Sequence, residues 1–275
     1  MDSKTSDAKW STSTKVIVPK IPQDIIDEIL DHLVTNPDFS IRSLQSCSLA
    51  SKSWVPSCRR HLFHTIFFTS RHMTRWLETF PVPEESPAHH VRDLRFSVGG
   101  PISVLERFFE HMPWFANVEG VALSRYNTFK PFWLPSFWRL PQSATSLTIR
   151  GDLIGVPQIQ NIMAQLPNLN DLSLSGSLGL MDDRALVGIG KALRGKFGGL
   201  LRLEDGYVDG GVVDMLLEIP TRLHFTEMYI HGTNECLLSA VRLAEACAQT
   251  LVMLSYMVDS DGKSHLWFWR AKHGR

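Results

Sequence analysis

Cys58, His61 and His64 come closest, by type and spacing, to a chemical site in this sequence. Thiolate and imidazole groups hold zinc in proteins, but tetrahedral zinc needs more ligands than this segment offers. His64 is also expected to begin a strand. His89 and His90 stand in a Pro-rich segment, where we expect solvated side chains. We therefore expect no metal site.

Two glycine-containing segments resemble catalytic or phosphate-binding motifs only in part. Gly188–Lys191 ends in Gly-Lys as a phosphate-binding loop does, but the motif's first glycine is missing and Ala192 stands where it needs Ser or Thr. Gly176–Gly179 lacks the spacing of a turn that presents a nucleophilic serine. No pair of carboxylates stands out for acid–base catalysis. The sequence predicts a protein that is not an enzyme and binds no cofactor.

The composition excludes several classes of partner. The 275 residues are 44% hydrophobic, and 28 basic side chains balance 28 acidic ones, which argues against broad binding to nucleic acid or to an anionic membrane. No apolar run reaches the ~18 residues of a membrane span. The polar segment 1–20 is interpreted as a flexible leader, because its apolar stretch is too short for a signal peptide. Four cysteines without a CxxC pair favour the cytoplasm, the nucleus or both.

The segment Ile21–Phe63 predicts short amphipathic helices. Pro22 suits a first helical turn, which needs no backbone N–H donor, and acidic residues come after it. A first apolar run at helical spacing ends at residues 36–38, Asn-Pro-Asp, and a second ends at residues 54–56, Trp-Val-Pro. So small a unit gains stability by burying apolar surface against a partner. The runs consist of Ile25, Ile26, Ile29, Leu30 and Leu33, then Ile41, Leu44, Cys47, Leu49 and Ala50.

This pattern resembles the F-box. Ile21 and Pro22 stand at the start of the motif, and residues 50–54, Ala-Ser-Lys-Ser-Trp, close its second helix. Ile21 and Ala50 replace the usual Leu and Val, and the loop at residues 36–40 is somewhat long. The resemblance implies a three-helix domain over residues 21–62 that docks onto the adaptor subunit of a cullin-based ubiquitin ligase.

The resemblance also implies which residues bind the adaptor. Sequence alone leaves open which of them contact the adaptor and which fill the core of the domain. A generic helical hairpin, whose apolar residues only form the core of a small domain, is the alternative. The implied adaptor-binding residues are Ile21, Pro22, Ile25, Ile29, Leu49 and Trp54.

From Phe63 onward a short apolar alternation recurs every 25 to 29 residues, which is the spacing of leucine-rich repeats. Several units also carry an apolar residue three positions before the alternation, and helical runs lie between the strands. We expect an α/β fold in which parallel strands form a curved sheet and helices cover its other side, as a β/α solenoid over residues 63–257. The Asn or Cys that usually follows the strand is missing, so the repeat type stays open. The alternations begin at Ile66, Leu94, Val121, Leu147, Leu172, Leu201, Met228 and Leu254, and the helical runs are Ile102–Met112, Val156–Leu166, Asp182–Leu193, Gly211–Leu217 and Cys236–Ala248.

Two segments fit the repeat less well. Phe129–Gln142 interleaves aromatic residues with prolines, and we expect its aromatics to plug the convex side, with a binding knob as the alternative. In residues 258–275 we expect a turn at residues 259–262, and then a strand over residues 265–269 that caps the last repeat. An exposed anchor is the alternative there.

Alternation along the strands predicts a binding surface, because every second side chain points away from the core. This row has mixed charge and scattered aromatics, which suits a protein segment better than a phosphate backbone. Its predicted substrate-binding residues are Arg95, Ser97, Arg150, Ser173, Arg202, Tyr229 and His231.

With both patterns the chain resembles fungal-type F-box proteins that carry a C-terminal leucine-rich-repeat-like region, and this resemblance implies a non-catalytic substrate-receptor subunit. Its F-box would bind the adaptor and through it the cullin, and its repeats would bind a protein substrate. The alternative function is a repeat scaffold for protein–protein interaction, independent of ubiquitin ligase.

Overall fold

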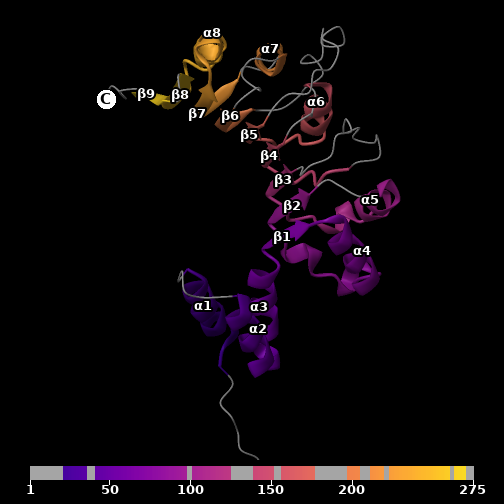
Figure 1. The fold of residues 1–275 in the computed structure, drawn as a ribbon. Helices are drawn as coiled ribbons and strands as arrows, with labels where there is room; N and C mark the ends of the chain where they lie inside the picture. The colour runs from indigo at the N-terminus through magenta and orange to yellow at the C-terminus, as the bar shows by residue number, and fades with distance from the viewer. Residues whose placement is uncertain are drawn as a thin grey trace, which may run out of the picture. The chain divides into compact units, whose positions relative to one another are not determined.

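The computed structural model describes residues 21–35, 41–97, 101–124, 139–151, 156–176, 197–204, 211–219, 223–260 and 263–270. It is a mixed α/β structure with one nine-stranded sheet, in which the strands lie side by side in chain order (Figure 1). The chain divides into two compact units, Met1–Cys58 and Arg59–Arg275. The division falls four residues before the predicted boundary at Leu62.

The first unit is helical. It contains α1 (Gln23–Val34), α2 (Ile41–Ala50), the short 3-10 helix η1 (Lys52–Trp54) and the start of α3 (Val55–Leu62). Pro22 is the residue before α1, where it leaves no helical N–H unpaired. The predicted end of the second helix at residues 54–56 is wrong, since α2 ends at Ala50 and Val55 begins α3. Pro56 is tolerated there because the N–H groups in the first turn of a helix have no acceptor within the helix, so a residue without an N–H breaks no helical hydrogen bond.

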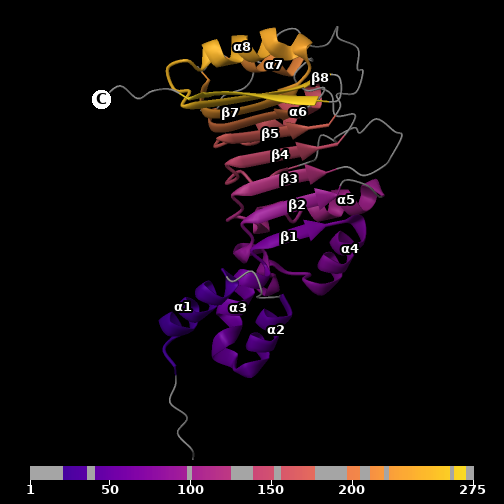
Figure 2. The same ribbon diagram turned by 60° about the vertical axis from the view of Figure 1, so that its left-hand side comes forward.

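The second unit consists of the sheet and the helices that cover one of its faces (Figure 2). Strands β1 to β8 are parallel, and each contains one predicted alternation. The strands are β1 (Thr65–Phe68), β2 (Asp93–Ser97), β3 (Gly120–Ser124), β4 (Ser146–Arg150), β5 (Asp171–Ser175), β6 (Gly198–Glu204), β7 (His224–Gly232), β8 (Met253–Ser260) and β9 (Lys263–Arg270).

Five helices and four short 3-10 helices are described between these strands. The helix α4 was not predicted, although Met73, Trp76 and Leu77 recur at helical spacing and are buried. Asp182–Leu193, Gly188–Lys191 and most of Phe129–Gln142 and Gly176–Gly179 lie outside the described residues. The helices are α4 (Ser70–Thr79), α5 (Ile102–Phe109), α6 (Val156–Ala164), α7 (Gly211–Leu217) and α8 (Leu237–Ala246), with η2 (Pro83–Glu85), η3 (Pro87–His90), η4 (Met112–Trp114) and η8 (Asn234–Cys236).

The core of the second unit lies between the sheet and these helices. Each strand from β2 to β7 buries its alternating apolar residues, as the period of two requires. Under β1 and β2 the core is aromatic: the Phe68 ring centroid lies 4.5 Å from that of Phe108 and 5.3 Å from that of Trp76. The apolar residues three positions before the alternations are buried too, namely Val118, Leu169, Phe225 and Leu251.

A repeating pair of backbone hydrogen bonds holds the starts of the strands in register. The His64 carbonyl accepts from the N–H groups of Arg92 and Asp93, both at 2.9 Å. The same pairing recurs one repeat later, where the Arg92 carbonyl accepts from Glu119 at 2.8 Å and Gly120 at 2.9 Å. The carbonyls of Glu119 and Thr145 continue the series. Successive repeats therefore share one backbone geometry at this point.

A polar side chain three positions before the strand adds a second link between repeats. Asn117 Nδ2 donates to the His89 carbonyl at 2.7 Å, and Ser143 Oγ donates to the Val118 carbonyl at 2.7 Å. Asn168 and Thr250 make the corresponding bonds before β5 and β8. Sequence reasoning missed this recurring position, although the residues are visible in the sequence at the repeat spacing.

The last strand runs against the others. Residues 253–260 of β8 pair antiparallel with residues 263–270 of β9. A connection through residues 261–262 is too short for the crossover that a parallel strand needs. The terminal strand predicted around residues 265–269 is therefore present, and β8 extends past the predicted boundary at residue 257.

None of the helices in the described ranges combines the length and apolar character that crossing a bilayer requires.

Candidate functional site

The first unit exposes apolar side chains on α1 and α2. Ile25 and Ile29 on α1 keep 42% and 38% of their surface exposed, and Leu49 on α2 keeps 86%. Ile21 and Pro22 are exposed before α1. Trp54 is half-buried. Five of the six predicted adaptor-binding residues are thus accessible in a unit whose core other residues supply.

Of two neighbouring apolar stripes on α1, one belongs to this core and the other is exposed. Ile26 and Leu30 are fully buried, together with Leu44 of α2 and Cys58 of α3. Ile25 and Ile29 lie one position earlier on the helix and face outward. The stripes are equally apolar in sequence, so only the packing of the unit distinguishes core from surface.

A buried hydroxyl ties α1 to α3. Gln23 Nε2 donates to Ser57 Oγ at 2.6 Å, and the Ser57 hydroxyl donates to the Asp27 carboxylate. Gln23 Nε2 also reaches Asp27 Oδ1 at 3.2 Å. Sequence reasoning missed this network, because residues 27 and 57 are brought together only by folding.

Replacing Ser57 by Ala is expected to lower the free energy of unfolding of the first unit by about 1–2 kcal/mol, because the Asp27 carboxylate and the Gln23 amide lose a buried partner. Hydrogen exchange of the α1 amides measures this change. Ser46→Ala is the matched control, since the exposed Ser46 hydroxyl bonds only within α2, and it should shift stability by less than about 0.5 kcal/mol. Equal exchange rates in the two variants would contradict the assigned role of the network.

The second unit presents a sheet face that no described helix of that unit covers, and we call it the helix-free face (Figure 2). The strand register aligns the predicted outward residues from Arg95 to Ser255 in one central row across the sheet, and Phe67 and Phe268, which were not predicted, extend this row at its two ends. That row is Phe67, Arg95, Ala122, Thr148, Ser173, Arg202, Tyr229, Ser255 and Phe268. A second row contains Ser97, Ser124 and Arg150 on β2 to β4, and Glu204 and His231 on β6 and β7.

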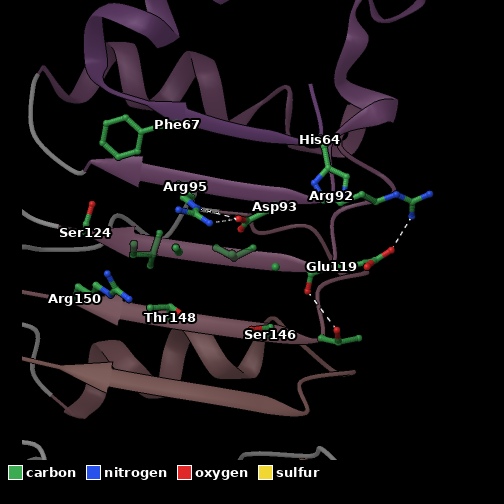
Figure 3. A pocket seen from close by; sticks show the side chains of 15 residues that line it. His64, Phe67, Arg92, Asp93, Arg95, Glu119, Ser124, Ser146, Thr148 and Arg150 are labelled. Atoms are coloured by element: carbon green, nitrogen blue, oxygen red, sulfur yellow. Dashed lines mark hydrogen bonds and ion pairs between the residues drawn. The ribbon is translucent and has the colours of Figure 1, made fainter. Parts of the chain in front are cut away.

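A hollow of about 620 Å³ opens on the helix-free face over β1 to β4 (Figure 3). Small residues on β3, Gly120 and Ala122, leave this space between larger side chains on neighbouring strands. Phe67 lies on the β1 side and Arg150 on the β4 side. The hollow therefore follows from residue size at adjacent positions in different repeats.

Charged side chains line the hollow, and two of its three arginines are paired. Arg95 donates from Nε and Nη2 to one oxygen of Asp93, at 2.9 and 2.6 Å. Arg92 meets Glu119 Oε1 at 2.9 Å at the rim (Figure 3). Arg150 is exposed, and its side chain makes no hydrogen bond or ion pair with any other described residue. Within the described part of the chain, the hollow thus offers one unpaired guanidinium beside two exposed pairs, which contribute little stability and can exchange partners.

A second group of predicted residues meets on β6 and β7, outside the hollow. The Arg202 guanidinium carbon lies 5.4 Å from the centroid of the Tyr229 ring. The Tyr229 hydroxyl lies 3.4 Å from Glu227 Oε2. This arrangement holds the ring by cation–π attraction and leaves the Tyr229 side chain half-buried.

Of the seven predicted substrate-binding residues, only Arg95 and Arg150 line the hollow. Arg202 and Tyr229 contact each other, while Ser97, Ser173 and His231 occupy other positions of the same face. Sequence reasoning missed Phe67, Asp93 and the residues before the strands, such as His64 and Glu119. Strand alternation could have found Phe67 and Asp93, which share the outward face with Arg95.

The fold shifts the pKa values of two of the cysteine and histidine side chains considered above, Cys58 and His90. Burial, with a smaller effect of the Cys47 thiol, raises the pKa of the Cys58 thiol. Burial lowers the pKa of His90, and His89, Arg59 and Arg60 lower it further. Among the described residues no group of three or more His, Cys, Asp or Glu is arranged to hold a metal ion. At neutral pH Cys58 is therefore a protonated thiol, which is a poor ligand and a poor nucleophile.

Comparison of the chain with protein-family models, with curated proteins and with solved structures found no match.

Proposed function

We propose that this protein is a substrate-receptor subunit of a cullin-based ubiquitin ligase. Its first unit is an F-box that binds the adaptor, and its second unit is a leucine-rich-repeat-like solenoid that binds a protein substrate on the helix-free face. The observation that carries the proposal is the exposed stripe of Ile25 and Ile29 beside a core that Ile26 and Leu30 already fill.

The energetics of the first unit support a partner. Burying an exposed Ile or Leu side chain contributes roughly 1.5–3 kcal/mol relative to leaving it in water. Ile21, Ile25, Ile29 and Leu49 all retain such surface. Ile25 and Ile29 lie one helical turn apart on α1, and exposed apolar surface of this kind on a small unit is typical of a protein interface. The order and spacing of these residues along the chain resemble those of the F-box, apart from the somewhat long loop at residues 36–40.

The regularity of the second unit supports the repeat assignment. The backbone pairs at the strand starts and the polar side chains three positions earlier recur from one repeat to the next. Each strand and helix buries its apolar side within its own repeat and against neighbouring repeats, as Phe68 of β1 does against Trp76 of α4 and Phe108 of α5, which is the principle of a solenoid. Such an array presents a long row of outward side chains for one extended ligand.

The proposed role is positioning rather than chemistry. The protein would supply no nucleophile and no proton acceptor. Holding a substrate close to the activated ubiquitin raises the effective concentration of the reacting groups, and this alone can accelerate a transfer by several orders of magnitude. Arg150, unpaired among the described residues, lines the same hollow as the paired Arg95, with β3 between them, and favours a substrate segment that carries a carboxylate or another anionic group.

The decisive experiment is co-purification of the full chain with an adaptor–cullin complex. Retention of the chain on the immobilised complex supports the ligase assignment. Hydrogen exchange first shows that the first unit of the preparation is folded. If this folded chain fails to bind the adaptor, the non-enzymatic repeat scaffold is left as the function.

Replacing Arg95, Arg202 and Tyr229 together by Ala is expected to abolish substrate capture and to leave adaptor binding unchanged. The three side chains lie in one row of the helix-free face, and arginine and tyrosine often dominate protein interfaces. Substrate proteins and adaptor retained by the full wild-type chain are compared quantitatively with those retained by the full-length triple variant. Arg71, Arg75 and Glu78 on α4 are exposed off this face, and their joint replacement by Ala is the control. Unchanged capture by the first variant would refute the site.

A further inference from the structure

The last strand, β9, is unusually apolar for the edge of a sheet. It pairs with β8 along one edge, and it ends the sheet. Its residues Leu266, Trp267, Phe268 and Trp269 are 65%, 69%, 60% and 49% exposed. Edge strands usually avoid further pairing through charges, prolines or bulges, because their free N–H and C=O groups accept another strand. Within β9 the register is unbroken from Lys263 to Arg270, so no bulge protects this edge.

Both faces of β9 expose apolar side chains. Phe268 lies opposite Ser255, and Leu266 lies opposite Met257, which belong to the helix-free face. Trp267 lies opposite the buried Tyr256, and Trp269 lies opposite Leu254, on the side that carries the core. A strand beside β9 would therefore extend the core layer under the two tryptophans and cover Leu266 and Phe268 on the other face.

We propose that β9 is a docking strand, to which an extended segment of a partner protein adds as a further strand of the sheet. Backbone hydrogen bonds would provide affinity, and the alternating apolar side chains would provide contacts on both faces. This inference does not depend on adaptor binding, because β9 belongs to the second unit.

The charge of β9 selects the class of partner. Lys263 and Arg270 flank its apolar centre, and residues 263–275 contain four basic residues and no acidic one. An antiparallel pair of two copies centred on β9 would set Lys263 opposite Arg270, and a parallel pair would set each of them opposite itself. Like charges directly opposite each other destabilise a strand pair. The charges thus disfavour a second copy and favour a segment with an apolar centre and acidic ends.

The test uses the full chain and labelled synthetic peptides of alternating Val and Thr, followed by fluorescence anisotropy. A peptide with glutamates at both ends should bind, and the same peptide with lysines at both ends should bind at least about tenfold more weakly. Two further acidic peptides carry N-methyl groups on one or the other alternate set of backbone amides. Binding should be lost for the set that faces β9 and retained for the other, because only the first set donates to the edge.

Two double variants and one control variant separate docking from folding. Joint replacement of Trp267 and Phe268 by Thr keeps residues that favour strands and should weaken binding of the acidic peptide at least about tenfold. Leu238→Ala, at an exposed leucine of α8, should leave it unchanged. Joint replacement of Lys263 and Arg270 by Glu should reverse the preference toward the lysine-ended peptide.

Specific outcomes would overturn the proposal. These are no binding of the acidic peptide at millimolar concentration, equal binding of the peptides with acidic and basic ends, or no reversal in the charge-exchanged variant. Sedimentation equilibrium tests for one more contradicting outcome, a dimer of the wild-type chain. If the joint replacement of Trp267 and Phe268 by Thr converts that dimer to a monomer, β9 would be assigned to self-association.

Discussion

Joint replacement of Ile25 and Ile29 by Asp is expected to abolish co-purification with the ligase adaptor. Both side chains are exposed in the isolated chain, so neither fills the core of the first unit. In the proposed interface they are buried, and an unpaired carboxylate there would have to be desolvated. We expect the dissociation constant to rise at least about hundredfold, as for two central residues of a protein interface. Surface binding measurements with the immobilised adaptor test this value.

The control for this variant lies on the same helix. Val34 is nine residues after Ile25, which at about 100° per residue places it on the opposite side of α1. It is exposed to a similar degree. Val34→Asp should bind the adaptor as the wild type does. Equal loss of binding in both variants would indicate that acidic substitution perturbs α1 as a whole, and unchanged binding of the double variant would contradict the proposed function.

Replacing Phe68 by Ala should destabilise the second unit by about 3–5 kcal/mol, the usual cost of removing a fully buried aromatic side chain. Phe68 is 1% exposed, and its ring contacts four aromatic residues of β2, α4, α5 and the segment after η4. The cavity would lie under β1, where neighbouring repeats are available on one side only. Chemical denaturation followed through an aromatic signal of the second unit measures the loss.

The adjacent residue provides the matched control. Phe67 is 44% exposed, because it points from β1 to the helix-free face. Phe67→Ala should change the free energy of unfolding by less than about 1 kcal/mol, while it widens the hollow over β1 to β4. A similar loss of stability in the two variants would contradict the orientation of β1 and with it the side of the hollow that Phe67 forms.

The strands and their faces could be predicted from the sequence because both depend on short-range patterns. Leu94, Val121 and Leu147 begin apolar alternations at the repeat spacing, and all three are buried. Since the repeats have nearly equal length, their strands pair in the register that the alternation implies. The helix α4 shows the same kind of local pattern and could have been predicted from Met73, Trp76 and Leu77.

The candidate sites could be predicted only in part, since they combine residues from different repeats that only the tertiary structure brings together. Arg95 and Arg150 were predicted on one face, but the hollow between them depends on Gly120 and Ala122 in the intervening repeat. The pairing of Arg95 with Asp93 and the contact of Arg202 with Tyr229 are side-chain arrangements that alternation does not specify. Adaptor binding and substrate binding themselves stay predictions.

By itself the sequence determined the apolar periods, and these decide which segments become helices or strands and which strand positions face the core. Only the tertiary structure decided that Ile26 and Leu30 fill the first unit while Ile25 and Ile29 remain exposed, and that Trp267 and Phe268 end the sheet uncovered. The physical reason is that periodicity describes one element in isolation. The exposure of a side chain also depends on which other elements cover each face of its helix or strand. In the first unit Leu44 and Cys58, which are distant from α1 in the chain, are buried together with Ile26 and Leu30.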